Sequence, residues 1–488
     1  MLFNSFEFLL FFPIVTIIYF LLPHKFRWFH LLVASCIFYM YFIPIYIFIL
    51  FLTIIIDYIA GIMIENATDK RKKLFLIMSI FANVGVLAVF KYYNFFIQNI
   101  NEALHLTNKA NALSLLNIVL PIGLSFHTFQ AMSYTIEVYR GKQKAEKHFG
   151  IYSLYVMFYP QLVAGPIERP QNMIHQFYEH HQLDYENVSK GMRLILWGLL
   201  KKVVIADRLN IATDAIFNKP THYSGITLAI GTFFFAFQIF CDFSGYSDIA
   251  IGTAKVMGFR LMTNFNKPYH SRSISEFWKR WHISLSTWFK DYLYISLGGN
   301  RVSVPRMYFN LFFVFLVSGF WHGANWTFII WGALHGFYLI FALFTKKYRD
   351  FFATKTGIKN NRHLNNLLNV ISTFILVDFA WIFFRANNIK DAFYIVNKIF
   401  YIPSEIIKVI HTKKTTFLNI PDFLDVLLPC FACILFLEIA HIIQVKYRME
   451  ETFDKKSAFF RWSLYYSGIF ALIYLGVYEK HQFIYFQF

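Results

Sequence analysis

Long apolar runs follow one another from one end of the sequence to the other. About eleven of them approach the roughly 20 residues that an α-helix needs to cross the hydrocarbon core of a bilayer. They lie near residues 6–22, 45–64, 74–97, 115–137, 188–206, 226–253, 308–320, 324–344, 367–384, 424–444 and 460–478. None shows the alternation of a barrel strand, so the backbone must satisfy its hydrogen bonds as helix. The sequence therefore predicts an all-α, polytopic membrane protein.

The composition agrees with this prediction. Of the 488 residues, 57% are hydrophobic and 15% are charged, whereas soluble domains carry roughly 25% charged residues. A net charge of +18 would suggest a nucleic-acid partner for a soluble protein. Here the cations gather between the apolar runs, which is the pattern of cytoplasmic loops near anionic lipid. We expect contact with membrane lipid, no nucleic acid, and one integral-membrane domain over residues 1–488.

Three further segments are apolar or aromatic without being simple spans. The pieces near 29–43 and 149–165 are short, which predicts half-spans or re-entrant segments. Residues 273–297 mix aromatic residues with cations, so we expect a tilted or re-entrant helix there. In one continuous helix, Trp278, Trp281 and His282 would share a face.

Two histidines lie inside the apolar stretch SGFWHGANWTFIIWGALHG, residues 318–336. Ionisable groups at membrane depth are costly and are functional candidates by default. His322 precedes Gly323, which would leave room for a substrate, and a neutral imidazole there is a candidate base for a hydroxyl. The alternative for His322 is a structural histidine bonded to a neighbouring helix. His335 would lie about 20 Å further along an unbroken helix, on another side, so we expect it to be structural.

Carboxylates also occur within an apolar run. Asp242 and Asp248 lie in FQIFCDFSGYSDIAIG, and Arg385 and Arg272 are candidate partners for them. We favour the support of a polar tunnel, and the alternative is an ion or proton relay that includes His127.

Familiar catalytic and metal-binding spacings are missing from the sequence. It has no HExxH, GxSxG or P-loop motif. Cys430 and Cys433 form a CxxC without a second pair of ligands, so we expect packing roles for both cysteines and no bound metal.

Several stretches resemble one family when they are taken together and in order. They are FNSFEFLLFFPI, LPIGLSFHTFQAMSYTIEVYRG, YPQLVAGPIERP, FCDFSGYSDIAIG, WKRWHISLSTWFKDYLYI and GFWHGANWTFIIWGALHG. The sequence closely resembles the membrane-bound O-acyltransferase (MBOAT) family, in its bacterial branch that includes the membrane component of alginate O-acetylation. The resemblance extends from residue 3 to at least residue 385.

The resemblance implies a thick helical bundle, the MBOAT fold, with funnels from both faces that meet near the midplane. It implies an enzyme, an O-acyltransferase that moves an acetyl group from a cytoplasmic thioester donor toward hydroxyls of an extracytoplasmic polysaccharide or cell-wall glycan. The donor would be acetyl-CoA or another acyl thioester, with no bound cofactor. The expected location is the bacterial cytoplasmic (inner) membrane, and the expected partner is an extracytoplasmic acetyltransferase or esterase-like protein.

The resemblance also maps the family's essential histidine onto His322 and a second motif residue onto His282. We therefore expect His322 to act as the general base and His282 to position a reactant or polarise a carbonyl. The candidate substrate-binding residues are Trp278, Trp281, Trp321 and Asn325. Two alternatives stay open: D-alanyl transfer to teichoic acid, the work of a sister branch, and a non-enzymatic membrane transporter.

Overall fold

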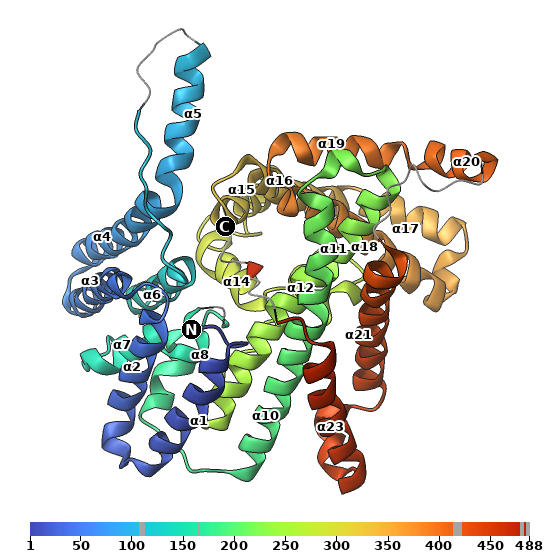
Figure 1. Ribbon diagram of the computed structural model, residues 1–488. Coiled ribbons are helices and arrows are strands. Elements are labelled where there is room, and N and C mark those ends of the chain that lie inside the picture. Colours follow the sequence, from blue (N-terminus) through green and yellow to red (C-terminus); the bar gives the residue numbers. More distant parts are fainter. Residues whose placement is uncertain (107–112, 164, 413–421, 479–482, 485–488) are drawn as a thin grey trace. The chain divides into compact units, whose positions relative to one another are not determined.

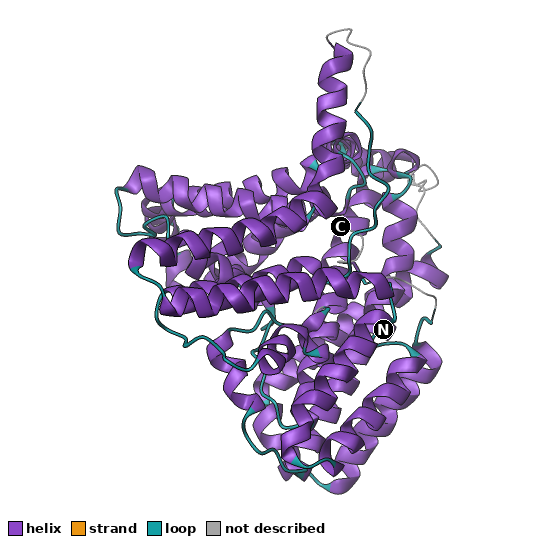
Figure 2. Cartoon of the chain, turned by 90° about the vertical axis from the view of Figure 1, so that its left-hand side faces the viewer, coloured by secondary structure: helices purple, strands orange, loops and turns teal. Residues whose placement is uncertain are grey.

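The computed structural model describes the whole chain except residues 107–112, 164, 413–421, 479–482 and 485–488 (Figure 1). Within the described residues the regular structure is helical, and no strand occurs (Figure 2). The all-α prediction is confirmed.

The chain divides into two compact units. Unit 1 comprises Met1–Ile195, Tyr246–Thr263 and Thr287–Leu293, and unit 2 comprises Leu196–Gly245, Asn264–Ser286 and Tyr294–Phe488. Both units therefore contain segments that are far apart in the sequence. The expectation of a single domain over residues 1–488 stays a prediction.

Unit 1 consists of helices joined by mostly short connections. Their bounds are α1 (Phe6–Leu21), α2 (His24–Met40), α3 (Ile47–Asn66), α4 (Asp69–Leu87), α5 (Tyr93–Leu106), α6 (Leu124–Tyr139), α7 (Phe149–Met157), α8 (Tyr159–Leu162), α9 (Pro170–Met173) and most of α10 (Tyr185–Leu199). Ser5 caps α1 by accepting a hydrogen bond from the Phe8 N–H. Pro44 begins a short 3-10 turn that leads into α3, where its missing N–H costs little. The two short apolar pieces predicted in this unit form α2, and α7 with α8.

Unit 2 carries the remaining helices. They are α11 (Asp207–Phe217), the first part of α12 (Gly225–Val256), α13 (Ile274–Trp278), α14 (Ile283–Trp288, most of it), α15 (Val304–His322), α16 (Trp326–Phe344), α17 (Lys346–Lys355), α18 (Arg362–Arg385), α19 (Ile389–Phe400), α20 (Ile402–Thr412), α21 (Leu428–Lys446), α22 (Met449–Thr452) and α23 (Ala458–Leu475).

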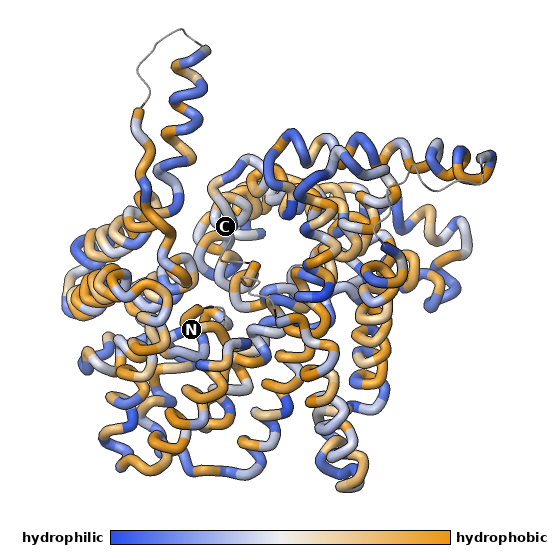
Figure 3. The backbone as a smooth tube through the Cα atoms, in the orientation of Figure 1, coloured by the Kyte–Doolittle hydropathy of each residue, from blue (hydrophilic) through white to orange (hydrophobic). Residues whose placement is uncertain are grey.

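Seven helical stretches among the described residues are long and apolar enough to cross a membrane. They are Pro44–Asn66, Asp69–His105, Gly225–Val256, Val304–His322, Trp326–Phe344, Arg362–Arg385 and Leu424–Lys446. Each corresponds to one of the predicted apolar runs, and the tubes of α3 and α4 are mostly hydrophobic in Figure 3. Apolar side chains such as Phe81, Ile375 and Leu435 are exposed on these helices, as expected where lipid is the solvent. The protein is a multi-pass membrane protein, and the predicted number of about eleven spans stays a prediction.

Helices α15 and α16 pack against each other with their backbones in close approach. A Cβ atom on Gly319 would lie 2.3 Å from the carbonyl oxygen of Phe328, and one on Gly332 would lie 2.3 Å from the carbonyl oxygen of Phe315. Neither distance is possible for a real side chain. Lipid is as apolar as a leucine side chain, so helices in a membrane associate largely through such small-residue contacts.

We predict that Gly332→Ala destabilises the protein by about 1–3 kcal/mol, the usual cost of overpacking, because its methyl group must push α15 away. The matched control is Gly85→Ala in α4, where no atom lies within 4 Å of the added Cβ. That control should be neutral or stabilising by up to about 1 kcal/mol. Thermal unfolding of both variants in detergent measures the difference, and equal stability of the two would contradict the close-packing argument.

Candidate active site

His322 is the last residue of α15, and the chain reverses directly after it. The connection is three residues long, and its Asn325 caps α16 by accepting a hydrogen bond from the Thr327 N–H at 3.0 Å. A Cβ on Gly323 would lie 2.2 Å from the Phe328 ring. The expectation that Gly323 leaves room for a substrate is therefore wrong, because the Phe328 ring occupies that space.

The His322 imidazole is enclosed by aromatic rings. The side chain is buried, with 3% of its surface exposed. Its ring centroid lies 4.9 Å from that of Trp321, 4.9 Å from that of Trp331 and 5.3 Å from that of Phe384. Aromatic walls of this kind separate the imidazole from bulk water.

His335 returns to the same aromatic cluster. Because α15 and α16 are separate helices that fold back on each other, the expected separation of about 20 Å along one helix does not apply, and that prediction is wrong. The Trp331 ring lies 5.0 Å from the His335 ring as well as beside His322. Trp278 donates a hydrogen bond from its indole N–H to Nδ1 of His335 at 3.3 Å, so the proton of a neutral His335 ring is on Nε2.

The segment 273–297 is not one helix. It forms α13, a turn, α14 and a π-helical stretch from Phe289 to Tyr294, and none of it qualifies as a membrane span. The expectation of a non-spanning segment is confirmed, but the shared helical face of Trp278, Trp281 and His282 is wrong because the turn separates them. His282 lies in this turn with a backbone φ of +42°, a left-handed conformation that few residues other than glycine adopt.

Hydrogen bonds define the His282 tautomer. The Asn264 side-chain oxygen accepts from the Ser284 backbone N–H at 3.2 Å and from the Ser284 hydroxyl at 2.9 Å. The same oxygen lies 3.2 Å from Nδ1 of His282, so Nδ1 must carry the proton and Nε2 the lone pair. Nothing in the sequence around Asn264 indicated this role.

A series of ring contacts connects the two motif histidines within unit 2. Neighbouring centroids along it are 4.9–6.3 Å apart, within the range of favourable aromatic pairs. The rings in order are His282, Phe265, Trp281, Trp381, Trp331 and His322. Phe265, Trp331 and Trp381 were not among the residues that the sequence singled out.

The four candidate substrate-binding residues have different surroundings. Trp321 contacts the His322 ring, and Trp278 is half-buried and bonded to His335. Trp281 is buried between Trp381 and the ring of Phe277. The side-chain oxygen of Asn325 accepts the capping hydrogen bond of α16. Substrate binding by these residues stays a prediction.

Asp242 has a partner that the sequence did not suggest. The Lys202 ammonium lies 2.7 Å from Asp242 and 2.8 Å from Asp207, and all three side chains are buried. The expected partners are engaged elsewhere, because Arg385 pairs with Asp214 and Arg272 with Glu276. Both suggested pairings are wrong.

Unit 1 has its own polar interior around α6. Thr53 and Nε2 of His127 are hydrogen-bonded at 2.6 Å, and Trp288 donates to the Ser133 hydroxyl at 2.9 Å. Glu137 accepts from Gln171 at 2.6 Å. The polar side chains along α6 therefore form hydrogen bonds inside unit 1.

Burial lowers the pKa of His282 from its ordinary 6.5 to about 3, and the residue lies outside the candidate spans. Between those pH values the unfolded chain takes up a proton that the native site excludes. The free energy of unfolding should therefore fall as the pH drops from about 6.5 toward 3, by about 1.4 kcal/mol per pH unit for this one group.

We predict that His282→Asn removes this one-proton slope, since asparagine tolerates the left-handed backbone and can still donate to Asn264. The measurement is chemical unfolding in detergent across pH 4–7. His363→Asn, at an exposed histidine of α18, is the control and should keep the wild-type slope. An unchanged slope in His282→Asn would show that His282 is not held neutral.

Comparisons with known proteins now identify the family. Residues 140–386, which include His282, His322 and His335, match the sequence profile of the membrane-bound O-acyltransferase family. The chain is 39% identical over 395 residues to a Pseudomonas aeruginosa protein described as a probable alginate O-acetylase, covering 80% of this chain and 73% of that one.

Two further relatives carry different names. The peptidoglycan O-acetyltransferase of Helicobacter pylori is 37% identical over 390 residues, covering 74% of this chain and 71% of its own. The teichoic acid D-alanyltransferase of Bacillus subtilis is 29% identical over 292 residues, covering 56% and 70%. The chain is an acyltransferase and belongs to the membrane-bound O-acyltransferase family.

Proposed function

We propose that the protein moves an acetyl group from a cytoplasmic thioester donor, acetyl-CoA or another acyl thioester, toward hydroxyls of an extracytoplasmic polysaccharide or cell-wall glycan. The observation that carries the proposal is the burial of His322 among aromatic rings at the point where α15 ends. The location would be the bacterial cytoplasmic membrane. An extracytoplasmic acetyltransferase or esterase-like protein would complete the delivery of the acetyl group.

The names of the relatives favour acetyl transfer. Two relatives at 39% and 37% identity, each matched over more than two thirds of both chains, are named for O-acetylation of alginate and peptidoglycan. The D-alanyltransferase matches at 29% over 56% of this chain. D-alanyl transfer to teichoic acid is therefore the second candidate. Because the chain belongs to an acyltransferase family, we prefer both candidates to a non-enzymatic transporter.

His322 would act as the general base. An imidazole nitrogen takes the proton of the attacking hydroxyl, and the hydroxyl oxygen bonds to the thioester carbonyl carbon. The carbon–sulfur bond then breaks, and the imidazolium returns its proton to the leaving thiolate. A buried, neutral histidine can do this because it is unprotonated at the start of the reaction.

His282 would position a reactant rather than exchange its Nδ1 proton. The Asn264 oxygen accepts the hydrogen bond of that proton and so keeps the proton on Nδ1. Nε2 then carries the lone pair of the imidazole. This is the arrangement in which a third group orients a histidine for its task.

Trp331 offers a donor for the developing oxyanion. Among the described residues, the buried indole N–H groups of Trp331 and Trp381 have no hydrogen-bond acceptor, which is costly unless a ligand or water supplies one. Trp331 is the one of the two whose ring contacts His322. We assign its N–H to the carbonyl oxygen of the acyl group.

We predict that His322→Ala lowers acetyl transfer by about 10²–10⁴-fold, the contribution of a positioned base, without loss of membrane insertion. The assay follows label from acetyl-CoA into glycan, per unit of inserted protein, in liposomes that also contain the partner protein. His363→Ala, an exposed histidine, should keep wild-type activity. Near-normal transfer by His322→Ala would show that another group is the base. Transfer from a D-alanyl carrier protein, with none from acetyl-CoA, would favour the second candidate.

Trp331→Phe keeps an aromatic ring beside His322 and removes the N–H. We predict a fall in kcat of about 10²–10³-fold with little change in KM, because an oxyanion donor acts mainly in the transition state. Trp462→Phe on the exposed face of α23 is the matched control and should have no effect. A rise in KM with unchanged kcat would assign Trp331 to substrate binding instead.

A further inference from the structure

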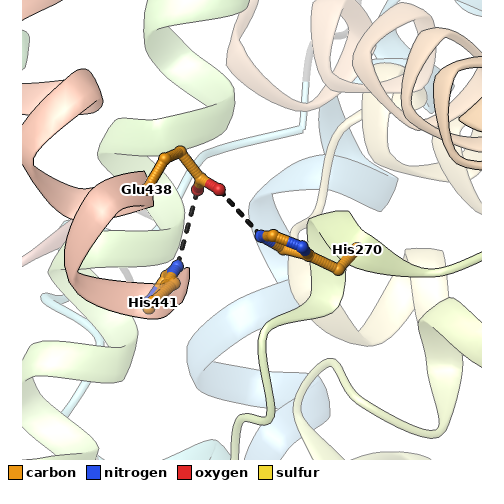
Figure 4. A group of neighbouring side chains, drawn as sticks. All are labelled: His270, Glu438 and His441. Atoms are coloured by element: carbon orange, nitrogen blue, oxygen red, sulfur yellow. Dashed lines mark hydrogen bonds and ion pairs between the residues drawn. The ribbon is translucent and has the colours of Figure 1, made fainter. Parts of the chain in front are cut away.

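Away from the aromatic cluster, unit 2 brings two histidines and a glutamate together. Nε2 of His270 lies 2.7 Å from one oxygen of Glu438, and Nδ1 of His441 lies 3.5 Å from the other. The three side chains point toward one another in Figure 4, His270 from the short turn before α13 and the other two from α21. Their ligand atoms all lie within 4.8 Å of one another, which singles this group out among the described residues.

We propose that His270, Glu438 and His441 bind a zinc ion. In a tetrahedral zinc site with bonds of 2.0–2.1 Å, the ligand atoms are about 3.3 Å apart. The distances of 2.7 and 3.5 Å run to different oxygens of Glu438, and all ligand atoms of the group lie within 4.8 Å of one another. Side-chain rotations would bring one carboxylate oxygen and the two imidazole nitrogens to the spacing that zinc needs. Two imidazoles and a carboxylate select a transition metal over magnesium or calcium. Three protein ligands leave one position for water or another ligand.

The surroundings suit a partly enclosed metal. His441 is buried, with its ring 5.9 Å from the Phe240 ring, while the side chains of Glu438 and His270 are partly exposed. Glu438 and His441 are three residues apart, so one side of α21 presents both. The Lys201 ammonium is a positive charge near His441. It donates a hydrogen bond to the Ser244 hydroxyl at 2.9 Å.

A zinc ion here would connect α21 with the chain from His270 to His282. His270 ends a 3-10 turn that leads through Ser273 into α13, and the next turn carries His282. The Phe240 ring beside His441 also contacts Phe265, which stacks on His282. The ion would therefore hold one end of the segment that orients His282, without touching the reacting atoms. This inference does not depend on the nature of the acyl donor or acceptor.

No local motif in the sequence indicates this site, because its ligands are far apart along the chain. His270 is 168 residues from Glu438, and a Glu-x-x-His pair alone is too common to indicate a metal. The expectation of no bound metal rested on local motifs, which cannot detect ligands brought together by the fold.

The test is the metal content of the full-length protein, purified in detergent with its affinity tag removed and dialysed against zinc. We expect about one zinc per chain by mass spectrometry, and a rise in melting temperature with zinc that EDTA reverses. His270→Ala should weaken zinc binding by more than about 100-fold, because it removes a ligand, whereas loss of a group that only orients a ligand costs about 10–100-fold. Glu438→Gln should do the same while preserving the side-chain shape.

Two controls separate this site from others. His270→Cys supplies a different zinc ligand and should retain the metal, whereas Cys430→Ser with Cys433→Ser should have no effect on zinc content. Wild-type protein without bound zinc, or with zinc content unchanged by His270→Ala and Glu438→Gln, would overturn the proposal. Because metal content is measured without substrate, these outcomes are independent of the proposed acyl transfer.

Discussion

The close backbone contact between α15 and α16 determines where the candidate active-site residues lie. Gly319 and Gly332 allow the two helices to approach so closely that a single methyl group on either would collide with a carbonyl oxygen. With the chain reversed over three residues, Trp331 of α16 comes to rest beside His322 of α15. The glycines of this region therefore shape the cluster through helix packing, and the space beside Gly323 is occupied by the Phe328 ring.

The aromatic cluster also explains how ionisable groups persist in so apolar a chain. Imidazole can be neutral, and rings around it need no charged partner, so His322 and His335 can be buried among tryptophan and phenylalanine. Lysine and aspartate cannot shed their charge so readily. Lys202 is buried between two carboxylates, Asp207 and Asp242, which share its charge and leave a network with compensating hydrogen bonds. The ion pairs of Lys202 connect the helical stretch before α11 with α11 and α12.

The sequence predicted the features that depend on local pattern. Apolar runs of sufficient length predicted the helices, and the cost of an ionisable group in such a run singled out His322. The apolar runs near 308–320 and 324–344 already left a gap around His322, which the structure confirms. The distance expected for His335 nevertheless assumed one unbroken helix, because the apolar character continues through Gly323 and Asn325. Asn264 and Trp381 could not have been found, since their roles depend on contacts across unit 2. The same limit explains the wrong partners suggested for Asp242.

The left-handed backbone at His282 is consistent with the proposed role of this residue in positioning a reactant. A left-handed φ at a residue other than glycine costs roughly 1–2 kcal/mol, and a buried aromatic side chain could fill this space from an ordinary turn. The surrounding contacts instead enforce the conformation: Asn264 bonds to the imidazole and to Ser284, two residues later, and Phe243 packs edge-on against the ring at 4.6 Å. Strain that is held in place by several independent contacts is typical of sites where one side chain must point in one direction. Packing alone would not require a defined tautomer, whereas a histidine that positions a reactant depends on one.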